Sequence, residues 1–213
     1  MNSLNRNRRF LAIGLAALGG YIDAVGFLEG GGLFVSFMSG NTTRLAVELA
    51  HDWRAAAAPA ALIAGFVCGV ALGAWLGEHA GRWRKPTVTS LVTLLITGAA
   101  LLRADHTVAT MALLVLAMGA VNNTFRREGE APFGLTYMTG ALVRLGQGLG
   151  LALAGRGNPG AGGHGLLWLG LTTGGVTGAL VHGAAADWAL WLAAGTCLLF
   201  SLWAYFVVRG DPA

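Results

Sequence analysis

Long apolar runs dominate the chain, and they restrict it to one class of fold. Most of them are close to the roughly 20 residues that an α-helix needs to cross the hydrocarbon core of a bilayer. A β-barrel would need alternating segments of about ten residues, whereas the runs here are continuous. The sequence therefore predicts an all-α integral membrane protein. Six good candidates lie at about 10–28, 57–77, 87–102, 107–121, 165–183 and 188–208, and two runs with polar interruptions lie at 33–50 and 133–153.

Composition supports this class and argues against others. Hydrophobic residues make up 55% of the 213 residues and charged residues only 11%, whereas about a quarter of a soluble domain is charged. The formal net charge is +4, but the basic residues cluster at the ends of apolar runs, as orientation signals do. We therefore expect the lipid bilayer as a partner, and no nucleic acid.

The sequence offers little for metal, cofactor or catalytic chemistry. Cys68 and Cys197 lie inside apolar runs, where a free thiol behaves as a small hydrophobe. No two histidines have metal-ligand spacing on one helix face, and no Ser, His and acid combination suggests hydrolysis. We expect no metal, no cofactor and no enzymatic activity, with a membrane-embedded enzyme as the weaker alternative.

An internal repeat divides the chain. A shift of 100 residues places "VSFMSGNTTRLA" (35–46) on "LTYMTGALVRLG" (135–146), with Met, Gly, Arg and Leu identical at four positions. A shift of 105 residues places Gly65, Gly69 and Gly73 on a second glycine ridge, Gly170, Gly174 and Gly178. Such ridges let transmembrane helices pack closely. The sequence predicts one membrane domain, 1–213, made of two repeats at about 1–103 and 104–213.

Basic residues indicate how the repeats are oriented. Short basic loops prefer the cytoplasm, and three clusters occur near 6–9, 82–85 and 126–127, followed by Arg209. All of them are cytoplasmic if segments 33–50 and 133–153 do not cross fully, which leaves six crossings, three in each half. An odd number per half inverts the second repeat, as in many secondary transporters. Both termini are then cytoplasmic.

The two polar segments are candidate helix breaks. Irregular backbone at membrane depth is tolerated where it is buried in protein or lines a cavity. The stretch "MSGN" with its repeat "MTGA" predicts such a break in each half, either discontinuous or re-entrant. Hydroxyl groups there can cap the freed backbone. The candidate substrate-binding residues at the two breaks are Ser39, Gly40, Asn41, Thr139 and Gly140.

Arg44 and Arg144 follow the two breaks by one helical turn. A helix N-terminus favours negative charge, and a guanidinium adds a fork suited to carboxylate or phosphate. The pair therefore indicates an anion-binding site. The structural alternative is local neutralisation or snorkelling. It is the stronger reading for Arg44, because Glu48 follows at i+4 as a helix partner.

Asp23 lies deep in the first apolar run, where a charged side chain costs about 2.5 to 3.5 kcal/mol on insertion scales. Such a residue can carry a proton, bind a cation or act as the counter-ion of an arginine. The 100-residue shift pairs Asp23 with Asn123, next to Asn122. Asn123 is a further candidate contact for substrate, and its structural alternative is a hydrogen bond between helices.

The stretches "GGYIDAVGFL", "FVSFMSGNTTRLA" and "NNTFRREGEAPFGLTYMTGALVRLG" resemble the YoaK-type family of small bacterial membrane proteins, a family of unknown function often labelled permeases. The likeness covers nearly the whole chain. Ser39 stands where the family usually shows Thr, and Asn122 where Gln is expected. The resemblance implies a bacterial inner-membrane location and six spans. Its motif positions here are Gly20, Asp23, Ala24, Met38 to Thr42, Asn123, Arg126 or Arg127, and Thr136 to Gly140.

These observations lead to an expected function. The chain is expected to transport a small solute, with an anionic group favoured, and Asp23 either couples a proton or balances charge. A non-transporting structural or regulatory membrane subunit and a channel are the alternatives. Because 213 residues is short for a transporter, a homodimer is also expected.

Overall fold

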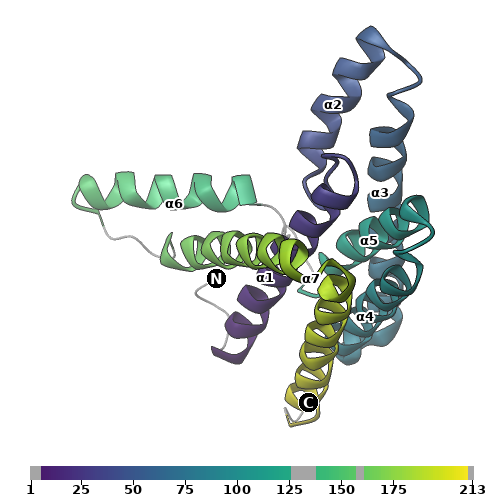
Figure 1. Cartoon of the computed structure of the whole chain (residues 1–213). Coiled ribbons are helices and arrows are strands. Elements are labelled where there is room, and N and C mark those ends of the chain that lie inside the picture. The colour runs from purple at the N-terminus through teal and green to yellow at the C-terminus, as the bar shows by residue number, and fades with distance from the viewer. Residues whose placement is uncertain (1–5, 126–137, 157–160, 211–213) are drawn as a thin grey trace.

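The computed structural model describes residues 6–125, 138–156 and 161–210, and these residues are helical apart from short connections (Figure 1). No strand occurs among them. The elements are α1 (Arg6–Glu29), α2 (Met38–His51), α3 (Ala57–Ala80), the 3-10 turn η1 (Gly81–Trp83), α4 (Arg84–Leu102), α5 (Thr107–Val121), α6 (Met138–Leu153) and α7 (Ala161–Gly210).

Three helical stretches are long and apolar enough to cross a membrane: Arg9–Glu29, Ala57–Leu102 and Gly162–Gly210. The prediction of an all-α membrane protein is thereby confirmed. The two longer stretches are not straight. Gly81, with a φ of +52°, turns the chain between α3 and α4. Ala185 interrupts α7 with φ −153° and ψ 61°, so that α7 has two arms that diverge in Figure 1.

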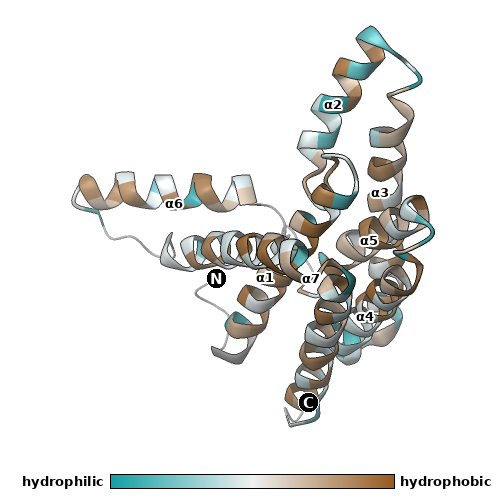
Figure 2. Cartoon of the chain, in the orientation of Figure 1, coloured by the Kyte–Doolittle hydropathy of each residue, from teal (hydrophilic) through white to brown (hydrophobic). Residues whose placement is uncertain are grey.

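The polar segments form the two short helices that project from the rest of the protein. Helix α2 has 14 residues and α6 has 16, which at 1.5 Å per residue gives roughly 21 and 24 Å, less than the ~30 Å hydrocarbon core. Helix α2 lies beside α3 and α6 beside α7, and the two do not contact each other (Figure 1). Figure 2 shows that α2 carries several hydrophilic positions, whereas the C-terminal arm of α7 is mostly hydrophobic.

The predicted break within "MSGN" and "MTGA" is wrong in position. Helix α2 begins at Met38, so Ser39, Gly40 and Asn41 are helical, and the stretch from Met138 onward is likewise helical in α6. The irregular backbone in the first half lies just upstream, in the segment 30–37. The corresponding approach to α6 lies outside the described residues.

Both glycine ridges are packing surfaces, and each packs against the other half of the chain. The ridge on α3 faces α5: a Cβ added at Gly73 would lie 2.8 Å from Ala120 Cα. The ridge on α7 faces α1: a Cβ added at Gly178 would lie 2.5 Å from the Tyr21 carbonyl oxygen. Glycine at these positions therefore allows direct backbone contact between helices.

The apolar core lies between helices that pack in pairs: α7 against α1 and α4, and α5 against α1 and α4. Its largest fully buried side chains include Leu15, Ile22, Ile96, Leu114 and Leu190. Polar contacts join the same helices. The Tyr21 hydroxyl donates to the Ala189 carbonyl at 2.9 Å, and the hydroxyl oxygens of Ser90 and Ser201 lie 2.8 Å apart. The second arm of α7 is thus bonded to both α1 and α4.

The α1–α7 contact leads to a stability prediction. An alanine methyl group at Gly174 would overlap the backbone carbonyl of Ala17, and overpacking of this kind costs about 1 to 3 kcal/mol. We expect Gly174→Ala to lower the thermal unfolding temperature of the detergent-purified protein. The control is Gly195→Ala on the same helix, where nothing lies within 4 Å of the new methyl group. Equal unfolding temperatures for the two variants would contradict the close contact.

Candidate functional site

The irregular segment 30–37 folds back onto α1, and Asp23 holds it there. Oδ1 of Asp23 accepts hydrogen bonds from the backbone N–H groups of Val35 at 2.9 Å and Ser36 at 2.8 Å. Among the described residues, these backbone donors bond to the Asp23 carboxylate and no arginine does, which is the partner that the counter-ion alternative expected. Two N–H groups outside any helix are satisfied in this way, which buried backbone requires.

Asn41 binds the same segment from the first turn of α2. Its Nδ2 donates to the Phe34 carbonyl at 2.7 Å, and its Oδ1 accepts from the Phe34 N–H at 3.1 Å. The side chain of Asn41 is fully buried. Asp23 and Asn41 together bond three consecutive residues of the irregular segment, so both candidates act on the chain's own backbone in this structure.

A pocket of about 330 Å³ lies beside Asp23. It lies at the low end of the roughly 300 to 1,000 Å³ that is typical of small-molecule sites. The rings of Phe27 and Phe34 approach each other with centroids 4.9 Å apart, and both line the pocket. Helices α1 and α7 and the segment 30–37 contribute its lining: Gly20, Asp23, Ala24, Phe27, Leu28, Phe34, Leu171 and Ala179.

The two arginine candidates are not brought together. Arg44 is exposed on α2, and its Nη1 donates to the Gly32 carbonyl, rather than bonding to Glu48. Arg144 is exposed on α6. Because α2 and α6 do not contact each other, the structure does not form the predicted two-arginine anion site.

The remaining candidates lie in three places. Asn123 is buried, and its Nδ2 donates to the Val70 carbonyl at 3.0 Å, which links α5 to α3 away from Asp23. Within α2, the Ser39 carbonyl accepts a hydrogen bond from the Thr43 hydroxyl at 3.1 Å. A Cβ at Gly40 would press on the Phe37 ring, whereas one at Gly140 would meet nothing within 4 Å. Thr139 lies beside Gly140 in the first turn of α6.

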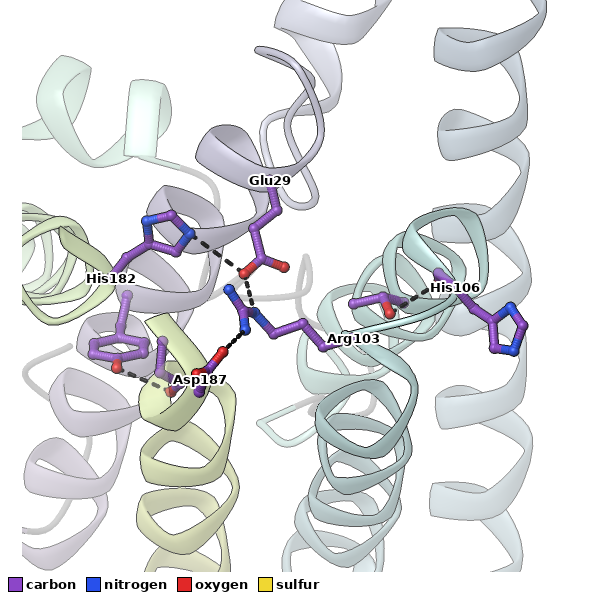
Figure 3. Close-up of polar contacts among 8 residues, drawn as sticks. Glu29, Arg103, His106, His182 and Asp187 are labelled. Carbon is purple, nitrogen blue, oxygen red and sulfur yellow. Dashed lines mark hydrogen bonds and ion pairs between the residues drawn. The ribbon is translucent and has the colours of Figure 1, made fainter. Parts of the chain in front are cut away.

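A second polar site was missed by the sequence analysis. Arg103, just after α4, pairs through Nε with Glu29 at the end of α1, and through Nη1 with Asp187 at 2.7 Å, near the α7 kink (Figure 3). His182 Nε2 lies 3.4 Å from Glu29 Oε1. We call Glu29, Arg103, His182 and Asp187 the Arg103 cluster. The detectable signal was opposite charge at the ends of three apolar runs.

The Arg103 guanidinium is stabilised in its charged form by its two carboxylate partners. The Glu29 side chain is only 11% exposed and that of Arg103 19%. The hydrogen bond from Arg103 to Glu29 raises the pKa of the guanidinium further above its ordinary value. The cluster thus fixes the ends of α1 and α4 and the kink of α7 next to one another.

Metal chemistry finds no geometric support in the described ranges, 6–125, 138–156 and 161–210. Within them no three His, Cys, Asp or Glu side chains gather closely enough to hold a metal ion. The chemistry available at the Asp23 pocket is therefore that of one carboxylate, backbone amides and aromatic rings.

The apolar helices and the buried polar contacts between them define a transmembrane protein of the α-helical class. The chain belongs to the family described as "Protein of unknown function (DUF1275)", which it matches over residues 11–203. It is 37% identical over 211 residues to a UPF0700 transmembrane protein of Rhizobium meliloti (strain 1021), covering 97% of this chain and 92% of that protein. The resemblance to the YoaK-type family, which is a DUF1275 family, is confirmed. No solved structure matches the chain.

Proposed function

We propose that this protein is a small-solute transporter of the bacterial inner membrane, with its substrate site in the Asp23 pocket. One observation carries the proposal: the pocket lies between α1 of the first half and α7 of the second, with the half-buried carboxylate of Asp23 in its wall. Secondary transporters place their sites at such a repeat interface and open them alternately by movement of one half against the other. The proposal assigns no catalytic residue.

Six crossings are part of this proposal, and the Arg103 cluster supports them. Glu29 and Arg103 are ion-paired, so the ends of α1 and α4 lie on the same side of the membrane. An even number of crossings must therefore separate them, and α3 and α4 supply two. Helix α2 then enters and leaves on one side. Arg103 and Asp187 are also ion-paired, so they lie on one side of the membrane and an even number of crossings separates them. Helix α5 and the first arm of α7 supply these two crossings, and α6 is then re-entrant.

Inverted halves follow from this topology. Helix α1 leaves the cytoplasm and α5 returns to it, and the predicted cytoplasmic termini are retained. The packing of the glycine ridges supports the same relation. The α7 ridge contacts α1 and the α3 ridge contacts α5, with matching spacing in each pair. The orientation residues Arg126 and Arg127 lie outside the described residues.

Labelling with a membrane-impermeant maleimide tests the topology. In a variant whose two native cysteines are replaced by serine, Asp105→Cys lies on the extracytoplasmic side and Arg82→Cys on the cytoplasmic side. We expect intact cells to label the first variant, and the second only after permeabilisation. Eight crossings predict the reverse pattern, because both polar segments would then cross.

Transport is tested by solute uptake into proteoliposomes, screened over small anions, cations, amino acids and sugars. Under the proposal at least one class accumulates, and replacing Asp23 abolishes uptake. In the six-crossing topology Arg44 and Arg144 lie near opposite faces of the membrane, so each serves a different entrance. For an anionic solute, Arg144→Ala is then expected to slow uptake from one side only. If uptake were unchanged in both the Asp23 and the Arg144 variants, neither residue would have the role in transport assigned to it.

A non-transporting membrane subunit is the second candidate. The observation that favours it is that Asp23 and Asn41 both bind the chain's own backbone. The projecting helix α6 also exposes Leu142, Val143 and Leu149, which a second copy of the chain would cover in a homodimer. In this reading no solute class accumulates, and the mass of the detergent-solubilised particle is that of a dimer. A channel predicts uptake that follows the gradient without coupling to protons.

A further inference from the structure

We infer that the Asp23 pocket recognises a small organic cation with an ammonium group, an inference that rests on the proposed function and names its substrate class. Among the described residues that line the pocket, Asp23 is the one ionisable side chain. A negatively charged solute would therefore meet a carboxylate and no cation. The arginines that suggested an anionic solute lie on α2 and α6, outside this lining.

The Asp23 carboxylate is held in place before any ligand arrives. Its Oδ1 is fixed by the N–H groups of Val35 and Ser36, so the position of the charge is set by the backbone of the segment 30–37. Both donors use the same oxygen. A preorganised charge of this kind lowers the ordering cost of binding a ligand of opposite charge.

The aromatic wall indicates which cations fit. Phe27 and Phe34 lie on the pocket with centroids 4.9 Å apart. The face of an aromatic ring attracts a cation, and quaternary ammonium groups are recognised by rings in this way. The remaining lining consists of Gly, Ala and Leu side chains, which suit the methyl groups of an alkylammonium ion.

An inorganic cation is poorly served by the same pocket. Calcium takes six to eight oxygen ligands and magnesium requires near-octahedral oxygen geometry. The pocket lining supplies one oxygen-bearing side chain, Asp23. Five of the lining residues, Gly20, Asp23, Ala24, Leu171 and Ala179, lie inside α1 and α7, where backbone carbonyls accept helical hydrogen bonds. A weakly hydrated organic cation matches this chemistry.

A matched set of probes tests the inference on the full chain in detergent. Choline, 3,3-dimethyl-1-butanol and 3,3-dimethylbutyrate have similar shapes and carry a positive, a neutral and a negative group. We expect choline and tetramethylammonium to raise the unfolding temperature, and the neutral and anionic analogues to leave it unchanged. The inference would be overturned if the neutral analogue raised the unfolding temperature of the wild type as much as choline does. It would also be overturned if neither choline nor tetramethylammonium raised it.

Three variants locate the site. Asp23→Asn is expected to lose the response to choline, and Phe27→Leu to weaken choline binding by about 3- to 10-fold while keeping an apolar wall. Phe10→Leu is the control, because Phe10 is an exposed aromatic residue of α1 outside the pocket. Phe27→Leu keeps the test valid if Asp23→Asn does not fold. Wild-type affinity for choline in Phe27→Leu would remove the aromatic contact from the site.

Failure of the inference differs from failure of the proposed function. Choline binding that depends on Asp23, without uptake of choline into proteoliposomes, keeps the cation site and removes transport. Uptake of an anionic or neutral solute that needs Asp23, with no response to either cation, keeps transport and overturns the cation preference.

Discussion

Asp23→Ala is expected to lower the free energy of unfolding by about 3 kcal/mol, because it leaves the N–H groups of Val35 and Ser36 without their acceptor. Each unsatisfied buried donor costs roughly 1 to 3 kcal/mol. Asp23→Asn retains an oxygen that can accept, so its cost is expected to be about 1 kcal/mol. Thermal unfolding of the detergent-purified proteins checks this. The unfolding temperature is expected to be highest for the wild type, lower for Asp23→Asn and lowest for Asp23→Ala.

Asp105→Ala is the matched control for this experiment. Asp105 is an exposed aspartate between α4 and α5, and its removal should be nearly neutral. If Asp23→Ala and Asp105→Ala unfold at the same temperature, then Asp23 does not stabilise the segment 30–37. Its role would then have to be assigned from ligand binding alone.

Arg103→Leu is the second change with a large expected effect. It leaves the Glu29 carboxylate, 11% exposed, without its guanidinium partner. Breaking a fully buried pair from one side costs about 3 to 5 kcal/mol. Arg103 retains some exposure and His182 stays near Glu29, so we expect about 2 kcal/mol here.

The double variant Glu29→Leu with Arg103→Leu separates pairing from packing. Replacing both partners by apolar groups removes the uncompensated charge, so the double variant is expected to be more stable than Arg103→Leu alone. Asp187→Ala should change stability little, because that side chain is 94% exposed. A double variant no more stable than the single one would mean that Arg103 acts through its packing.

Much of the fold follows from local features of the sequence. Apolar runs predicted the helices, and the repeated stretch that starts at Met38 begins α2. The helix break was placed too late because Ser, Gly and Asn favour irregular backbone on average, whereas here Asn41 is helical and bonds back to Phe34. A tertiary hydrogen bond, which no local propensity contains, decides this position.

The site was only partly predictable. The carboxylate of Asp23 stood out from its apolar neighbours in the sequence, but its partners lie 12 and 13 residues away through a turn. The Arg103 cluster joins residues 74 and 84 positions apart. Pattern reasoning compared equivalent positions of the two repeats, and this directed attention to Arg44 and Arg144 rather than to contacts between helix ends.

Each glycine ridge packs against a helix of the other half of the chain, and this affects how the protein folds during synthesis. Among the described helices, α1 contacts α5 and α7, and none of the helices between 30 and 102. During synthesis the first helix therefore meets its first helical partner, α5, only after about half of the polypeptide has been made, and α7 only after that. Neither half of the chain can reach its native packing alone, so the two halves assemble as one unit.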